Sequence, residues 1–258
     1  MDRLGKLIAF YNGFLIIVCL LCIYAIYRYT KIQCPRIPKE EYILYTDPHT
    51  PSNYRVLISA QCSRYQDWQV ICLLWSLKKY WPDVHATRIL NCSGSDELMY
   101  PYTHTVPTYI VPDWSTHPKT KDFYPPYNRP VGLVYYMKYV SVPEEYMVIL
   151  DPDIIVRKPL SDVPVRKGAP VAHYAGFMKD HFKTIADAYL PEDKKDNLQA
   201  MGVPIIIHRD YLAQIAPLWL EYTEKIRNDP VILEEIGWIS EMFGYSIAAA
   251  LLGIQHDV

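Results

Sequence analysis

The sequence predicts an α/β domain built on a mostly parallel sheet flanked by helices. Short apolar runs of strand length alternate with longer segments of helical periodicity, which is the pattern of repeated βα units. The chain has 258 residues, half of them hydrophobic, which is ample for one core and marginal for two. We therefore expect one catalytic-size domain, preceded by a segment of different character.

The N-terminal segment is predicted to anchor the chain in a membrane. Residues 7–27 carry no charged side chain, and at about 1.5 Å per residue they reach roughly 30 Å, the thickness of a hydrocarbon core. The bulky residues before Arg28 do not suit a signal-peptidase site, so we expect an uncleaved anchor. Basic residues flank both sides, and charge leaves the orientation open. We assign residues 1–6 to a short N-terminal tail, 7–27 to a transmembrane signal anchor and 28–53 to a proline-containing stem.

The globular domain is expected to occupy residues 54–258. Its first apolar run, 54–60, predicts a buried strand, and 66–80 predicts a helix because large apolar side chains recur there at helical spacing. Those side chains are Trp68, Ile71, Cys72 and Trp75. Later strands are expected at 85–90, 105–111, 146–150 and 203–208, with shorter candidates at 154–156 and 170–174. Later helices are expected at 131–140, 211–227 and 238–252.

Composition and the absence of two motifs exclude several classes of function. The 26 basic and 28 acidic side chains nearly cancel, so no strong field recommends nucleic acid as a partner. Neither G-x-G-x-x-G after the first strand nor a Walker loop occurs, which disfavours a dinucleotide-binding fold and a P-loop NTPase. Cys62 and Cys92 both follow predicted strands, and a disulfide between them or two free buried thiols fit equally well. Asn91-Cys92-Ser93 also matches the N-glycosylation pattern.

The acidic sequence Asp151-Pro152-Asp153 is the strongest candidate site. It follows the apolar strand at 146–150, and ligands of open α/β sheets bind where strands end. Asp151 and Asp153 supply hard oxygen ligands for Mn²⁺ or Mg²⁺, which neutralise the charge of a diphosphate leaving group. The alternative is a plain turn, because aspartate and proline are also good turn residues.

Glu241 is a second candidate, on the basis of its spacing. It lies three residues after Trp238 and four before Tyr245, inside the apolar stripe of the predicted last helix. A carboxylate there should face the protein, and buried carboxylates are uncommon unless they are paired or take part in chemistry. The alternative is a first-turn glutamate that complements the helix dipole.

Several long segments resemble one family in the same order along the chain. Residues 149–157 (ILDPDIIVR) resemble the D-x-D strand of the plant and algal cell-wall glycosyltransferases that modify hydroxyproline-rich glycoproteins. The segments 111–120 (VPDWSTHPKT), 128–132 (NRPVG) and 237–246 (GWISEMFGYS) look like the peptidyl serine α-galactosyltransferase branch of this family. The hydroxyproline O-arabinosyltransferase branch shares Tyr65-x-x-Trp68-Gln69 and 87–90 (TRIL). The resemblance runs from about Tyr54 to the last residue, while the family pattern continues further and includes a later His-Tyr. We therefore expect a domain that lacks the family's C-terminal part.

The resemblance implies a GT-A-type nucleotide-diphospho-sugar transferase domain on a type II anchor in the Golgi apparatus or endoplasmic reticulum, with the domain in the lumen. It implies a UDP-sugar donor and a divalent cation, Mn²⁺ or Mg²⁺. Carried onto this chain, it assigns Asp151 and Asp153 to the metal, and to the donor Ser59, Gln61, Arg88, Arg129 and Asp151. It places His173, Tyr174 and Trp238 on the acceptor side. In such an enzyme a buried Glu241 is expected to orient the acceptor hydroxyl or to steady charge at the anomeric centre. A surface charge for each arginine and a structural role for His173 remain the alternatives.

The function expected from these features is transfer of a sugar, galactose first, from a UDP-sugar to a serine or hydroxyproline hydroxyl of a secretory glycoprotein, with retention. The alternative within the class is arabinosyl transfer to hydroxyproline. The alternative from another class is a truncated, non-catalytic membrane-anchored protein that binds a donor or a partner.

Overall fold

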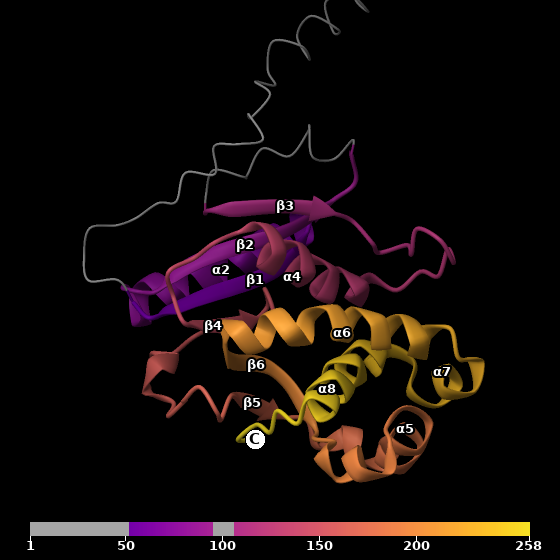
Figure 1. Cartoon of the computed structure of the whole chain (residues 1–258). Coiled ribbons are helices and arrows are strands. Elements are labelled where there is room, and N and C mark those ends of the chain that lie inside the picture. The colour runs from indigo at the N-terminus through magenta and orange to yellow at the C-terminus, as the bar shows by residue number, and fades with distance from the viewer. Residues whose placement is uncertain (1–51, 95–105) are drawn as a thin grey trace, which may run out of the picture. The chain divides into compact units, whose positions relative to one another are not determined.

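The computed structural model describes residues 52–94 and 106–258, which are coloured in Figure 1. The predicted tail, anchor and most of the predicted stem lie outside these residues. Within the described residues, no helix combines the length and hydropathy needed to cross a membrane.

The centre of the fold is a six-stranded sheet with the order β3-β2-β1-β4-β6-β5. β1 pairs in parallel with β2 and β4, and β2 pairs in parallel with β3. β6 is antiparallel to both β4 and β5, so the sheet is mixed, with its parallel half where the sequence predicted it. The strands are β1 (Tyr54–Gln61), β2 (His85–Cys92), β3 (Thr108–Pro112), β4 (Tyr146–Leu150), β5 (Val171–Tyr174) and β6 (Met201–His208).

Helices cover both faces of the sheet because the strand side chains alternate between them. On β1, Leu57 packs into the same cluster as residues of α4 and α6, whereas Val56 and Ile58 pack with residues of α2. α6 and α8 lie against each other and beside β6 in Figure 1. The helices are α2 (Arg64–Tyr80), α4 (Asn128–Tyr139), α5 (Phe182–Tyr189), α6 (Arg209–Arg227), α7 (Pro230–Ile236) and α8 (Ser240–Leu252). Short 3-10 turns are η1 (Pro125–Tyr127), η2 (Leu160–Asp162), η3 (Gly176–His181), η4 (Glu192–Asn197) and η5 (Gly237–Ile239).

The segment after β4 does not form the predicted strand at 154–156. The chain turns at Pro152 and Asp153, and the amide of Ile154 donates to the carbonyl of Asp151 at 3.3 Å. The amide of Val156 then donates to Ser76 Oγ of α2 at 3.0 Å, which holds this segment against the helix. The strand prediction is wrong here because a side chain of α2 satisfies the backbone away from the sheet.

α2 forms where a helix was predicted, and the sheet packs on the side opposite the apolar residues that predicted it. Ser63 caps its start by accepting from the amide of Gln66 at 3.2 Å. The side chains that pack on the sheet are Val70, Leu73 and Leu77. The apolar residues that predicted the helix, Trp68, Ile71, Cys72 and Trp75, are exposed instead.

The cysteine alternatives are resolved by the fold. Cys62 and Cys92 form a disulfide between the ends of the adjacent strands β1 and β2, and Cys72 is the free cysteine of the described residues.

Asn91, the asparagine of the N-glycosylation pattern, is 1% exposed, and its amide donates to the carbonyls of Pro112 at 3.1 Å and Asn128 at 3.2 Å. In the folded chain this side chain has a structural role and is not an accessible glycan acceptor.

A buried charged cluster lies at the beginning of β1. Arg55 donates to Glu144 through Nε at 3.0 Å and Nη2 at 2.7 Å, and His85 Nδ1 lies 2.6 Å from the same carboxylate. Burial by itself raises the pKa of Glu144, but the hydrogen bonds from Arg55 and His85 outweigh it and hold the pKa below its ordinary value. The Glu144 side chain is 1% exposed, so its charge depends on these partners.

Glu144→Gln is expected to lower the free energy of unfolding by about 3 kcal/mol, because it leaves the Arg55 guanidinium buried without a counter-charge. Urea denaturation at neutral pH measures the effect. The exposed neighbouring substitution Glu145→Gln is the control and should change stability by under about 0.5 kcal/mol. Equal effects of the two substitutions would contradict a buried pair.

His256 gives the domain a pH-dependent stability. The side chain is buried, with its Nε2 2.7 Å from the Tyr245 hydroxyl, and burial lowers the pKa of His256 to about 4 from an ordinary value of 6.5. The unfolded chain therefore takes up this proton more readily, and stability is lost as the pH falls from 6.5 through about 4. We expect a loss of at most about 3 kcal/mol from this group.

Denaturation curves between about pH 7 and about pH 4 measure this loss. His256→Gln cannot titrate, so its stability should fall less over the same range than that of the unsubstituted chain. Parallel pH profiles for the two proteins would show that His256 is not the titrating group.

Candidate functional site

A pocket of about 520 Å³ opens where β1 and β4 end. These strands are parallel neighbours, so their carboxyl ends meet at one edge of the sheet. The pocket wall combines these strand ends with parts of α2, α4, β5, β6, η5 and α8. It brings together eight of the sequence-predicted residues, namely Ser59, Gln61, Arg129, Asp151, Asp153, His173, Trp238 and Glu241.

The acidic turn brings two carboxylates to the pocket. β4 lies between β1 and β6 in the sheet and ends at Leu150. Asp151 follows directly and therefore lies at the edge of the sheet. Pro152 and Asp153 form the turn, and both also line the pocket. The turn and the ligand-binding interpretations of this motif are therefore compatible in one structure.

Arg129 bridges Asp151 and Glu241. Its Nη2 donates to Asp151 Oδ1, and its Nη1 donates to Glu241 Oε2 at 3.1 Å and Oε1 at 3.3 Å. Burial alone would lower the pKa of Arg129, but the two carboxylates outweigh burial and raise the pKa. The guanidinium therefore stays charged and holds an acid on each side of it.

Glu241 faces the protein, as its spacing predicted. Its side chain is 4% exposed, and burial raises its pKa to about 7, with Arg129 opposing and Asp151 reinforcing that shift. The reason differs from the prediction, because α8 is buried on nearly all sides and does not present a single apolar stripe. Trp238, counted in that stripe, is 69% exposed.

The charge balance of the pocket favours a cation. Its described lining residues carry three carboxyl groups, Asp151, Asp153 and Glu241, and one basic group, Arg129. A diphosphate is repelled by such a pocket unless a cation accompanies it.

The donor set fits a divalent ion that also binds substrate. No group of three or more His, Cys, Asp or Glu residues within 52–94 and 106–258 is arranged to hold a metal. Mg²⁺-type ions are commonly held by one or two carboxylates together with substrate phosphates, and Asp151 with Asp153 matches that arrangement. These residues would hold Mn²⁺ or Mg²⁺ only as part of a complex with a diphosphate.

Hydrogen bonds to Asn128 fix the beginning of α4 and hence Arg129. The Asn128 amide donates to Asp113 Oδ1 at 2.7 Å and to Ser115 Oγ at 3.0 Å, and its Oδ1 accepts from the amide of Trp114 at 2.7 Å. Gln61 Nε2 also donates to Ser115 Oγ, which ties the end of β1 to the same loop. Residues 111–120 and 128–132 therefore act together to present one guanidinium.

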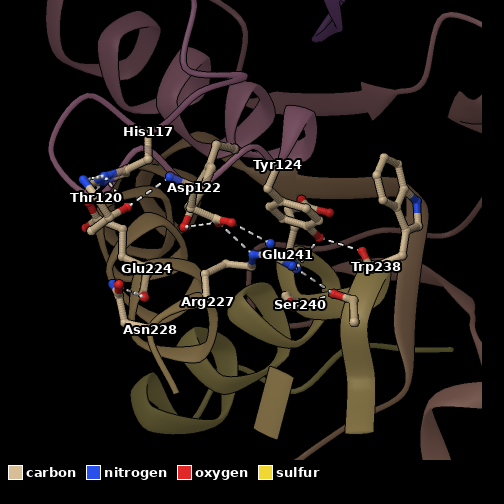
Figure 2. A network of polar contacts seen from close by, with 12 residues as sticks. His117, Thr120, Asp122, Tyr124, Glu224, Arg227, Asn228, Trp238, Ser240 and Glu241 are labelled. Atoms are coloured by element: carbon tan, nitrogen blue, oxygen red, sulfur yellow. Dashed lines mark hydrogen bonds and ion pairs between the residues drawn. The ribbon is translucent and has the colours of Figure 1, made fainter. Parts of the chain in front are cut away.

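Tyr124 fixes the beginning of α8 and hence Glu241, as Figure 2 shows. Its hydroxyl donates to the carbonyl of Trp238 at 2.5 Å and accepts from the amide of Glu241 at 3.0 Å. The guanidinium carbon of Arg227 lies over the Tyr124 ring, 4.2 Å from its centroid. Arg227 also donates two hydrogen bonds to the carboxylate of Asp122, at 2.8 and 2.7 Å. The loop 116–127, the helix α6 and the start of α8 are thus linked behind the pocket.

Two residues predicted to belong to the site lie outside the pocket wall. Arg88 is 1% exposed, and its guanidinium contacts Asp67 Oδ1 at 3.3 Å and Thr108 Oγ1 at 3.2 Å. Tyr174 is 47% exposed and has Lys179 Nζ 5.2 Å from its ring centroid. The structure does not bring either residue to the donor or acceptor position that the resemblance implied.

Other lining residues were not singled out from the sequence as site residues. Exposed Tyr65 and Phe177 and the partly buried Met242 line the pocket. Tyr65 belonged to a quoted family segment and had that signal. Phe177 had none, because only the tertiary fold brings η3 to this edge of the sheet.

Comparisons with known proteins identify the family of this chain. The model of the hydroxyproline O-arabinosyltransferase family N-terminal domain matches residues 54–258. Peptidyl serine alpha-galactosyltransferase of Arabidopsis thaliana is 36% identical over 224 residues, covering 81% of this chain and 27% of that protein. Hydroxyproline O-arabinosyltransferase 3 of the same plant is 29% identical over 216 residues, covering 80% of this chain and 58% of that protein. The chain thus spans less than two thirds of either relative.

The comparison with solved structures includes two glycosyltransferases with TM-scores below 0.5. The galactosyltransferase LgtC, in complex with donor and acceptor sugar analogues, has a TM-score of 0.48 at 12% identity. The match covers 78% of this chain and 72% of the LgtC chain. Mouse xyloside xylosyltransferase 1 in its apo form has a TM-score of 0.45 at 7% identity. The match covers 80% of this chain and 84% of the mouse chain. The family is decided by the sequence match. This chain belongs to the hydroxyproline O-arabinosyltransferase family.

Proposed function

We propose that this chain transfers a sugar from a UDP-sugar donor to a serine or hydroxyproline hydroxyl of a polypeptide, using a divalent cation, Mn²⁺ or Mg²⁺. The observation that carries the proposal is the convergence of Asp151, Asp153, Arg129 and Glu241 in one pocket at the strand ends. The domain is of the GT-A type in this account. Serine and hydroxyproline as acceptor residues come from the names of the relatives.

The donor is bound by the end of β4 and the beginning of α4. A divalent ion held there supplies positive charge to the diphosphate that leaves the sugar. Asp151 and Asp153 hold that ion, and Arg129 places a fixed positive charge beside Asp151. Ser59 and Gln61, at the end of β1, line the part of the pocket assigned to the uridine.

Glu241 is assigned to the reacting centre. Its carboxylate lies on the far side of Arg129 from Asp151, buried and with a pKa raised to about 7 by that burial. Such a group holds a proton or a negative charge close to neutral pH, as acid–base and charge-stabilising groups do. His173 and Trp238 line the same pocket and are assigned to the acceptor side.

Galactose is the first choice of sugar because the relative with 36% identity is an alpha-galactosyltransferase. Transfer from an α-linked UDP-galactose to an α-linked product retains the anomeric configuration. Arabinosyl transfer to hydroxyproline is the second candidate, and the family match of residues 54–258 supports it.

In this proposal the chain is a single-pass type II membrane protein of the Golgi apparatus or endoplasmic reticulum, with residues 7–27 as its anchor. The uncharged character of these residues supports the anchor. The disulfide between Cys62 and Cys92 supports a lumenal domain, because disulfides persist in oxidising compartments.

A panel of UDP-sugars, incubated with the full chain and peptides that carry serine or hydroxyproline, tests the function. We expect transfer in the presence of Mn²⁺ and its loss on addition of EDTA, with UDP-galactose or UDP-arabinose as the preferred donor. Mass spectrometry identifies the product. Metal-dependent UDP binding without transfer to either peptide would show that the chain binds a donor but is not an enzyme for these acceptors.

A further inference from the structure

α2 exposes a strip of large apolar side chains to solvent. Tyr65, Trp68, Ile71 and Trp75 are 67%, 54%, 50% and 59% exposed. At about 100° per residue they lie within one third of the helix circumference, opposite the side that packs on the sheet. We call these four residues the α2 strip. Contiguous exposed apolar surface of this kind marks an interaction site more often than chance exposure does.

The α2 strip is continuous with the pocket. Tyr65 lines the pocket, and its ring contacts the ring of Trp68 edge to face, with centroids 6.1 Å apart. Phe177 and Trp238, 58% and 69% exposed, line the same pocket from η3 and η5. Aromatic rings from three separate elements therefore border the pocket, and one of them begins a strip that leads away along α2.

The spacing of the strip matches an extended proline-rich polypeptide. Trp68 and Trp75 are seven residues apart, about 10.5 Å along a helix axis. A polyproline II helix repeats every three residues, about 9.3 Å, so consecutive turns present equivalent faces at nearly this interval. Aromatic-lined surfaces bind this conformation well because it is preformed and loses little entropy.

We propose that the α2 strip binds the acceptor polypeptide in the polyproline II conformation, next to the residue whose hydroxyl enters the pocket. This inference rests on the proposed function, in which the acceptor hydroxyl belongs to serine or hydroxyproline. The strip sets which polypeptides are accepted, whereas Asp151, Asp153 and Glu241 serve the transfer itself. Lys79, whose Nζ lies 5.0 Å from the Trp75 ring centroid, marks the far end of the strip.

The test compares two acceptor peptides with the same target residue. One has a proline-rich flank of about twelve residues, roughly four turns of polyproline II, and the other has no flank. Trp68→Ala and Trp75→Ala are each expected to raise KM for the flanked peptide about tenfold, a typical loss for one buried aromatic anchor. kcat, KM for the short peptide and UDP binding should stay unchanged.

Tyr139→Ala removes an aromatic ring of similar exposure, 62%, on α4, outside the strip and the pocket, and serves as the matched control. Equal KM values for unsubstituted and Trp75→Ala proteins with the flanked peptide would overturn the inference. So would an equal gain in affinity from a flexible glycine-serine flank of the same length. A changed oligomeric state or weaker binding to anionic lipid vesicles, with KM unaltered, would assign the strip to a second copy or to a membrane instead.

Binding of the flanked peptide, followed by tryptophan fluorescence without donor, separates this inference from the proposed function. If the unsubstituted chain transfers sugar to neither peptide but binds the flanked peptide through Trp68 and Trp75, the proposed function fails and the binding strip stands. If it transfers sugar to both peptides with equal KM, the function stands and the strip fails.

Discussion

Asp153→Ala is expected to slow sugar transfer by at least about a hundredfold, which corresponds to roughly 3 kcal/mol in the barrier. The substitution removes one of the two carboxylates that meet at the end of β4. Without it the pocket loses one ligand for the cation that accompanies the diphosphate. Initial rates at saturating Mn²⁺ and peptide measure the effect, and a higher Mn²⁺ requirement should accompany it.

Asp162→Ala is the matched control for this substitution. Asp162 is exposed in η2 and does not line the pocket, so its loss should leave the rate and the Mn²⁺ requirement unchanged. A thermal melt checks that both variants fold. Full activity of folded Asp153→Ala in the presence of EDTA would show that transfer does not require a divalent cation.

Arg129→Ala is expected to reduce transfer by a similar factor of about a hundred, because charge-assisted hydrogen bonds to two groups are lost together. Without the guanidinium, the carboxylates of Asp151 and Glu241 repel each other with no positive charge between them. Arg129→Lys keeps the charge but not the two-sided geometry, so we expect an intermediate rate. Steady-state kinetics with UDP-sugar as the varied substrate measure both variants.

Two further variants sharpen the test of Arg129. Arg166→Ala removes an exposed arginine outside the pocket and should have no effect on the rate. Glu241→Gln should reduce the transfer rate by a smaller factor in the Arg129→Ala protein than in the unsubstituted protein. The reason is that residues in one hydrogen-bonded network are not independent. Strictly additive losses would mean that Arg129 and Glu241 act separately.

The acidic turn could be predicted from the sequence because its signal is local. Five apolar residues of a strand followed directly by Asp151-Pro152-Asp153 determine both the element and its end. The strand β1 was predictable for the same reason, since a buried parallel strand is a continuous apolar run. Glu241 was predicted to be buried from its neighbours alone.

The orientation of α2 could not be predicted in this way. The helix carries apolar side chains on two sides, and periodicity alone cannot show which of them packs on the sheet. The larger, aromatic side is the exposed one. This side leads to the pocket, because Tyr65 lines the pocket wall.

Arg88 illustrates the limit of transferring a role by motif. A charged residue within a strand was assigned to the donor, but the fold pairs its guanidinium with Asp67, a residue distant in sequence that only α2 brings near. The helix α7 was missed for a different reason. No helix was expected between residues 228 and 237, although Asp229 caps α7 and Pro230 begins it, and both are helix-start signals.

Calorimetric titration of UDP into the full chain, with and without Mn²⁺, tests the central claim most directly. The pocket sets three carboxyl groups against one guanidinium, so UDP should bind measurably with Mn²⁺ and at least about tenfold more weakly without it. Asp153→Ala should remove that difference, and Asp162→Ala should preserve it. UDP binding of equal strength in the presence and absence of Mn²⁺ would contradict the account of this pocket.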